Sequence, residues 1–226
     1  MIKLLTADLR RLPLAESYER MISSLPEADR QRAERFLRQE DRIRCAAGAF
    51  LTRHCIREAL RAAGKDAGFT VARTEYGKPY VPGHPRLHFS LSHSGAMIVY
   101  AQAESETGVD AEEIRDINIA DFSAFLYPHE MQRIDSADDP ADEFFRIWTV
   151  REAVSKAEGS GIPLFEREKL LIDYDKEQAV LHGKTFRFRS VRTEGYYISV
   201  CTESPLPEIQ PRCISPEEWE KILDAE

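Results

Sequence analysis

The stretch GVDAEEI, residues 108–114, predicts a short strand with a costly charge pattern, and it marks the middle of the chain. Successive strand side chains alternate between faces, so Asp110 and Glu112 point the same way, about 6–7 Å apart, while Val109 and Ala111 take the other face. If both carboxylates are ionised and partly buried, they repel each other by about 2 kcal/mol. A solvated strand face would relieve this repulsion, and so would a divalent cation, which typically takes one or two carboxylates. From this stretch alone, the solvated face is the favoured interpretation.

Helix and strand patterns on the two sides of this stretch follow the same order. A strand over residues 2–8 precedes a long helical region over residues 26–60, which we expect to break near residues 39–41. Further strands are predicted over residues 87–93, 96–104, 169–175, 184–190 and 195–203, with a second strong helix over residues 141–159 and a last one after Ser215. We therefore predict an α+β fold of two similar halves, residues 1–106 and 107–226. Each would be a long helix on a small, mostly antiparallel sheet, and a pseudo-twofold axis would relate them.

Composition narrows the classes of partner. The chain has 226 residues, 42% of them hydrophobic, with a net charge of −8. That balance argues against attraction to nucleic acid or to an anionic membrane, although nine arginines gather between residues 30 and 61. The four cysteines show no metal-ligand spacing, and no stretch approaches the roughly 20 apolar residues that span a bilayer. We expect a cytoplasmic protein that binds neither nucleic acid nor membrane.

The segment WTVREAVSKAEGSGI, residues 148–162, offers further charged groups. Glu152 and Lys156 are four residues apart, so they share one helix face. They are compatible with an ordinary surface ion pair worth about 0.3–0.5 kcal/mol. They are equally compatible with a binding site in which Glu152 binds a metal and Lys156, one turn later, binds an anion. The spacing alone does not distinguish the ion pair from the binding site.

Two other segments carry candidate ligand contacts. LHFSLSHSG, residues 87–95, ends a strand with Ser92 and His93, whose hydroxyl and imidazole could hold a phosphate at a turn. EYGKPYVPG, residues 75–83, places Lys78 in a rigid turn, which could flank a ligand or be a plain loop. No order of residues supports a Ser/His/Asp hydrolase.

Together, in order and spacing, these segments resemble the large, two-halved 4′-phosphopantetheinyl transferases that activate peptide and polyketide synthetases. The resemblance runs from the arginine-rich helix to about residue 162, through YGKP (76–79) with HFSLSHS (88–94), then GVDAEEI and WTVREAVSKAEGSGI. The family patterns are G-[IV]-D-x-E and W-[ST]-x-K-E-[AS]-x-x-K. Either pattern alone is a weak signal, but both in sequence after S-H-S are specific.

The resemblance implies a role for each matching acid and lysine. Asp110, Glu112 and Glu152 would bind Mg²⁺, with Mn²⁺ as an alternative. Lys156 would contact the coenzyme A pyrophosphate, and Glu152 would act as the general base, with a water near the acids as the alternative. One departure is Arg151, which stands where the family has lysine.

The resemblance also implies the residues that bind coenzyme A. These are Ser92 and His93 at the phosphates, Lys78 and Pro79 beside the adenine, Arg44 near the 3′-phosphate, and Arg32 as a second contact there. Arg42 is a rival of Arg44, because the register of this helix could slip.

The implied reaction transfers 4′-phosphopantetheine from coenzyme A to a serine of an apo acyl or peptidyl carrier protein. It releases adenosine 3′,5′-bisphosphate, and the family class implies a monomer. We expect the carrier to dock on residues 121–131, with Phe122, Phe125, Leu126 and Met131 partly exposed, although these could equally be core residues. The alternative function is a non-catalytic coenzyme A or nucleotide-binding module of the same fold, which the presence of all three acids and Lys156 disfavours.

Overall fold

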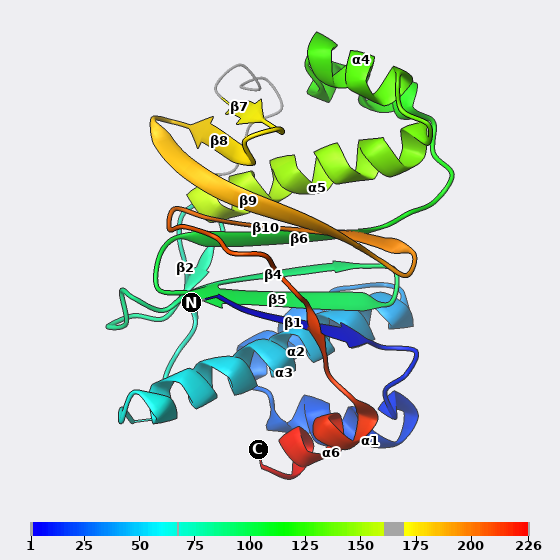
Figure 1. Ribbon diagram of the computed structural model, residues 1–226. Coiled ribbons are helices and arrows are strands. Elements are labelled where there is room, and N and C mark those ends of the chain that lie inside the picture. The colour runs from blue at the N-terminus through cyan, green and yellow to red at the C-terminus, as the bar shows by residue number, and fades with distance from the viewer. Residues whose placement is uncertain (1, 67, 161–169, 226) are drawn as a thin grey trace.

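The computed structural model describes residues 2–66, 68–160 and 170–225, and in these residues two larger sheets lie between two groups of helices (Figure 1). The first sheet has the order β11-β1-β5-β4, with β1 at Lys3–Asp8, β4 at His88–Ser94, β5 at Met97–Ala103 and β11 at Arg212–Cys213. The second has the order β6-β10-β9-β8-β7, with β6 at Thr107–Glu113, β7 at Leu170–Asp173, β8 at Gln178–Leu181, β9 at Lys184–Thr193 and β10 at Tyr196–Thr202. This architecture confirms the predicted α+β class. The pseudo-twofold relation stays a prediction.

The outer face of the first sheet is covered by helices α1 (Leu14–Ser24), α2 (Glu27–Glu34), α3 (Gln39–Ala62) and α6 (Pro216–Asp224). A small hairpin of β2 (Ala72–Arg73) and β3 (Pro79–Tyr80) stands beside them. The arginine-rich region is broken as expected, but the break lies just before the predicted residues 39–41, because α2 ends at Glu34 and α3 starts at Gln39. Helix α1 is absent from the sequence prediction, although Leu14, Tyr18, Met21 and Ile22 recur at helical spacing and pack on the first core.

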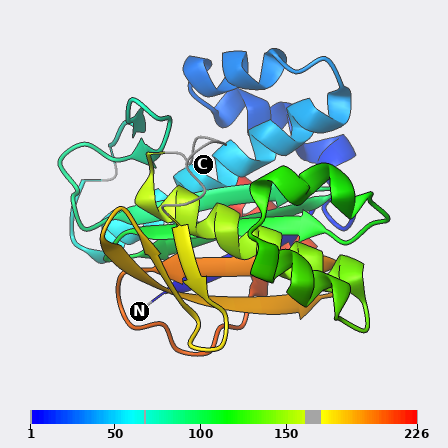
Figure 2. The same ribbon diagram turned by 90° about the horizontal axis from the view of Figure 1, so that it is seen from above.

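The second sheet is covered by α5 (Pro140–Glu158) and α4 (Pro128–Asp135), and the 3₁₀ segment η1 (Ile119–Phe125) leads into α4. Seen from above, α4 and α5 lie over the orange strands of this sheet, while the blue N-terminal helices project at one side (Figure 2). Helix α5 begins where Asp139 accepts a hydrogen bond from the Asp142 amide at 3.1 Å, and it ends at Gly159, whose φ of 85° suits glycine. The last two residues of the second motif, Gly161 and Ile162, lie outside the described residues.

A third apolar core lies between the two sheets. Val109 and Ala111 of β6 face it, as the alternation in GVDAEEI predicts, together with residues of β1, β5 and β10. Asp110 and Glu112 therefore face away from this core, toward α5 and β4. The two sheets thus pack directly on each other.

The C-terminal segment crosses back to the first sheet. Strand β11 runs parallel to β1, and α6 buries Trp219 against Phe50, with ring centroids 5.2 Å apart. Residues 212–224 thus pack with the first sheet and its helices, and Ile214, Trp219, Ile222 and Leu223 belong to the first core. The predicted division after residue 106 falls just before β6 and stays a prediction. None of the described helices is both long and apolar enough to cross a membrane.

Candidate active site

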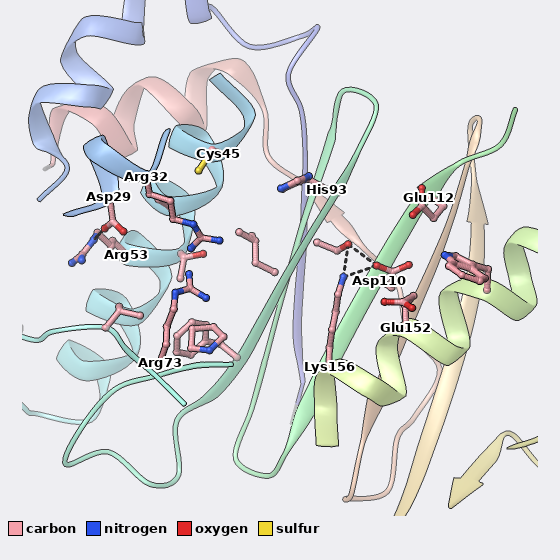
Figure 3. Close-up of a pocket in the computed structure, with 18 residues that line it drawn as sticks. Asp29, Arg32, Cys45, Arg53, Arg73, His93, Asp110, Glu112, Glu152 and Lys156 are labelled. Carbon is pink, nitrogen blue, oxygen red and sulfur yellow. Dashed lines mark hydrogen bonds and ion pairs between the residues drawn. The ribbon is translucent and has the colours of Figure 1, made fainter. Parts of the chain in front are cut away.

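A cavity of about 470 Å³ opens between the two halves, a volume typical of small-molecule sites. Its two sides differ in charge, as Figure 3 shows: three arginines with Asp29 come from the first half, and three further acids come from β6 and α5. The charged or polar residues that line it are Asp29, Arg32, Thr52, Arg53, Arg73, Ser92, His93, Asp110, Glu112, Glu152 and Lys156. Most of the residues that the sequence proposed for the site thus meet in one place.

Asp110, Ser92 and Lys156 form a closed triangle in this cavity, drawn with dashed lines in Figure 3. Asp110 Oδ1 accepts hydrogen bonds from Ser92 Oγ at 2.8 Å and from Lys156 Nζ at 2.6 Å, and Lys156 Nζ lies 2.9 Å from Ser92 Oγ. Asp110 is only 3% exposed, and its buried Oδ2 has no hydrogen-bond partner among the described residues. A buried carboxylate oxygen without a partner is costly unless a further donor or cation approaches it.

Glu112 and Glu152 complete the acidic side. Burial raises the pKa of Glu112, and the charge of Asp110 adds to the rise, while a hydrogen bond from Ser94 Oγ at 2.6 Å opposes it. Burial also raises the pKa of Glu152, again with a contribution from Asp110. Asp110 and Glu112 therefore repel each other, as the spacing in GVDAEEI predicted, and Glu152 adds a third charge to the repulsion. A cation between the three carboxylates would remove that cost.

The structure supports the predicted metal ligands chemically but does not show a formed metal site. In the described part of the chain, no group of three or more His, Cys, Asp or Glu residues is arranged so that it could hold a metal ion. Asp110 and Glu152 face each other, whereas Glu112 lies further along β6 (Figure 3). Hard carboxylate oxygens in one cavity, with Asp110 Oδ2 unpartnered, are nevertheless the donor set that Mg²⁺ accepts. The residues present fit such an ion.

The opposite side of the cavity is positively charged. Arg32, Arg53 and Arg73 line it, and Arg53 Nε is held by Asp29 Oδ2 at 2.5 Å. Partial desolvation lowers the pKa of His93, although its side chain still reaches solvent, and nearby positive charges, Arg44 first among them, lower it further. A neutral imidazole among several cations can donate a hydrogen bond to an anion that the arginines attract.

Three basic residues singled out from the sequence lie off the cavity lining. Arg44 pairs with Asp41 at 3.2 Å, although it is close enough to influence His93, and its rival Arg42 donates to the Phe36 carbonyl oxygen at 2.6 Å. Lys78 donates instead to Glu106 and to the carbonyl oxygen of Ala157 at the end of α5. Pro79, the residue that follows Lys78 and was proposed with it, does line the cavity.

The Glu106 carboxylate explains why Lys78 turns away. Burial acts to raise the pKa of Glu106, but hydrogen bonds from His88 and Lys78 outweigh it and hold the pKa at about 2. The side chain of Lys78 also packs over Gly159, where an added Cβ would lie 2.5 Å from Lys78 Cδ. Lys78 thus ties the first half to the last turn of the helix that carries Lys156.

Arg151, the departure from the family pattern, points into the second core and away from the cavity. Its Nη1 donates to both oxygens of Glu130, at 3.0 and 2.9 Å, and Glu130 is fully buried. The same carboxylate accepts from the Tyr174 hydroxyl at 2.6 Å and from the Tyr127 amide at 2.8 Å. This network ties α5 to α4 and to the end of β7.

The expected docking segment is only partly exposed. Phe122 and Phe125 are half-buried and pack edge-on against Trp148, which lines the cavity. The expectation for Leu126 is wrong: it is 1% exposed, because the chain turns inward there between η1 and α4 and places it in the second core. Met131 is half-buried against the same core.

Arg53, Arg73 and Trp148 were absent from the predicted site. Arg53 could have been found, because Cys45, Ala49, Thr52 and Arg53 line the cavity with the spacing of one helix face. Arg73 lies on a two-residue strand, and nothing in its local sequence distinguishes it from a loop residue.

Comparisons with known proteins agree with this geometry. The model of the N-terminal part of 4′-phosphopantetheinyl transferases matches residues 12–105, and that of the 4′-phosphopantetheinyl transferase superfamily matches residues 106–201. A 4′-phosphopantetheinyl transferase of Bacillus subtilis is 34% identical over 67% of this chain and 68% of its own. The 4′-phosphopantetheinyl transferase Sfp of Bacillus subtilis strain 168 is 27% identical over 84% of this chain and 87% of its own length. The transferase gsp of Aneurinibacillus migulanus is 28% identical over 80% of this chain and 77% of its own length. The chain therefore belongs to the 4′-phosphopantetheinyl transferase superfamily, as an enzyme of the Sfp type.

Proposed function

We propose that this transferase takes the 4′-phosphopantetheine group from coenzyme A and attaches it to a serine of an apo acyl or peptidyl carrier protein. The single observation that carries the proposal is the division of charge within one cavity. Arginines on one side suit the 3′-phosphate of a nucleotide, and Lys156 with three carboxylates on the other suits a pyrophosphate with its divalent cation.

The reaction forms a bond between the serine oxygen and the β-phosphorus and breaks the bond to adenosine 3′,5′-bisphosphate, which leaves. The cavity residues bind and orient both reactants for in-line attack. Lys156 neutralises charge on the pyrophosphate, and His93 donates a hydrogen bond to it. Asp110, Glu112 and Glu152 would hold Mg²⁺, which when bound screens the charge that develops on the phosphates.

Glu152 is the general base in this proposal, since it lines the cavity opposite Asp110 on a rigid helix. The test is transfer by a Glu152→Gln variant, which keeps the size and polarity of the side chain. We expect a loss of turnover of at least about 100-fold, within the range of general-base contributions. Near-normal turnover with intact divalent-cation binding would remove Glu152 from this role.

The decisive experiment incubates the protein with coenzyme A, Mg²⁺ and an apo carrier protein and then measures the mass of the carrier. A gain of one phosphopantetheine that EDTA prevents supports the transferase and its metal. No gain with carriers from fatty-acid, polyketide and peptide synthetases would favour the non-catalytic coenzyme A-binding module. Calorimetry with coenzyme A would then show whether the cavity still binds it.

Docking of the carrier is proposed to use Phe122 and Phe125, which are half-buried beside Trp148 at the cavity. Replacing both phenylalanines by Ala should raise the KM for the carrier without changing the affinity for coenzyme A. An Arg73→Ala variant provides the matched control, because it should do the reverse. An unchanged carrier KM in the double variant would contradict this docking surface.

We also expect the enzyme to be monomeric and cytoplasmic.

A further inference from the structure

Two strands from different sheets lie side by side at the cavity without forming a ladder of backbone hydrogen bonds. Strand β4 is the edge of the first sheet, and β6 is the edge of the second (Figure 1). The sequence HFSLSHS places a serine at every second position of β4, at Ser90, Ser92 and Ser94. Alternation on a strand puts all three on one face, and the structure turns that face toward β6.

Two of the three hydroxyls accept hydrogen bonds from backbone amides of β6 in place of a ladder, while Ser92 donates to the Asp110 side chain. Ser90 Oγ accepts a hydrogen bond from the Val109 amide at 3.0 Å. Ser94 Oγ accepts one from the Glu113 amide at 3.1 Å. Each serine contacts a residue 18 or 19 positions further along the chain, so the two strands run parallel and in register. Edge-strand amides that would otherwise lack a partner are thereby satisfied.

Ser94 makes one contact that Ser90 does not. While its oxygen accepts the Glu113 amide, its hydroxyl donates to Glu112 Oε2 at 2.6 Å. A hydroxyl has a single proton, so this arrangement commits that proton to the carboxylate. Glu112 lies further along β6 than Asp110 and apart from Glu152 (Figure 3), and the Ser94 hydroxyl is the side-chain donor that the structure shows on its carboxylate.

We propose that Ser94 is a positioning residue that orients the Glu112 carboxylate for the divalent cation of this site. The inference rests on the proposed function, because it takes Glu112 to be a metal ligand. Hydrogen-bond partners of metal-binding carboxylates fix their direction, and removing such a partner typically weakens metal affinity by about 10–100-fold. In this chain the partner comes from the other half of the molecule, so the closeness of β4 to β6 would set the geometry of the acids.

The experiment measures Mn²⁺ binding to the free protein by electron paramagnetic resonance, without coenzyme A or carrier. Ser94→Ala should weaken Mn²⁺ binding by at least about tenfold. Ser94→Thr keeps the hydroxyl on a residue that suits a strand and should restore binding. Ser90→Ala is the matched control, because it removes a hydroxyl that accepts one β6 amide but touches no carboxylate. It should lower the unfolding midpoint about as much as Ser94→Ala and leave Mn²⁺ affinity unchanged.

The outcomes separate this inference from the function it rests on. If wild-type protein binds Mn²⁺ and Ser94→Ala binds it equally well, the positioning role is overturned while the metal site stands. If Ser90→Ala and Ser94→Ala weaken binding equally, the serines act only by spacing the strands, and the role assigned to Ser94 is again overturned. If wild-type protein binds no Mn²⁺, the proposed metal site fails and the inference fails with it.

Discussion

Gly108, the first residue of GVDAEEI, lies where β6 closely approaches the backbone of α5. An added Cβ would be 2.0 Å from the Ala153 carbonyl oxygen and 2.4 Å from the Ala157 amide nitrogen. Both are backbone atoms, so no side-chain rotation can relieve the contact. Replacing Gly108 by Ala must push the strand and the helix apart, by about 1 Å if the closest contact is to reach even 3.0 Å.

That displacement has two measurable consequences. Overpacking of this kind typically costs about 1–3 kcal/mol of unfolding free energy, and a clash with backbone belongs at the upper end. The same movement separates Asp110 on β6 from Lys156 on α5, whose charged atoms now lie 2.6 Å apart. Because misplacement of reacting groups by about 1 Å can cost about 100-fold in rate, we expect a loss of transfer of that order.

The assays are urea unfolding and the mass of a carrier protein incubated with coenzyme A. Gly68→Ala is the matched control: a Cβ there makes only ordinary contacts, at 3.6 Å or more, and Gly68 does not line the cavity. Its stability should stay within about 0.5 kcal/mol of wild type. A Gly108→Ala protein with a wild-type unfolding midpoint would refute the close approach of β6 and α5.

Three further predictions follow from buried or paired charges. Glu130→Gln leaves Arg151 buried without its counter-charge, so the unfolding free energy should fall by about 3 kcal/mol. In a double-mutant cycle, adding Arg151→Met to the same chain should recover part of this loss. If the two effects simply add, the two side chains are not coupled. Glu106 has a pKa of about 2 in the fold, below its ordinary value, so the stability it contributes should be complete above about pH 5 and vanish as the pH falls toward 2. The difference in unfolding free energy between wild type and Glu106→Gln should shrink over that range, and a constant difference would contradict the ion pair. Asp110→Asn keeps an oxygen that can accept from Ser92 and Lys156 but removes one negative charge from the three carboxylates. Transfer should therefore be abolished, while the unfolding free energy stays within about 1 kcal/mol of wild type. Retained transfer would exclude Asp110 as a metal ligand.

Local periodicity predicted the elements that carry the chemistry. The alternation in GVDAEEI identified β6 and its two faces, and the four-residue spacing in α5 placed Glu152 and Lys156 on one side. Two elements were missed for different reasons. Helix α1 does carry apolar residues at helical spacing, at Leu14, Tyr18, Met21 and Ile22, and that signal was overlooked. Strand β8 has only four residues, too few for a clear alternation. Their places are decided by the sheets and helices on which they pack.

The sequence by itself therefore determined which acids and which lysine stand together on each element, because strand and helix periods fix faces over a few residues. Only the tertiary structure decided what lies opposite them. The serines of β4 contact β6 because the edges of the two sheets lie side by side. Arg53 and Arg73 line the same cavity from separate elements, whereas Lys78 lies outside the cavity lining and pairs with Glu106. Trp219 joins the first core from the far end of the chain, since burial of large apolar side chains depends on contacts that no local pattern contains.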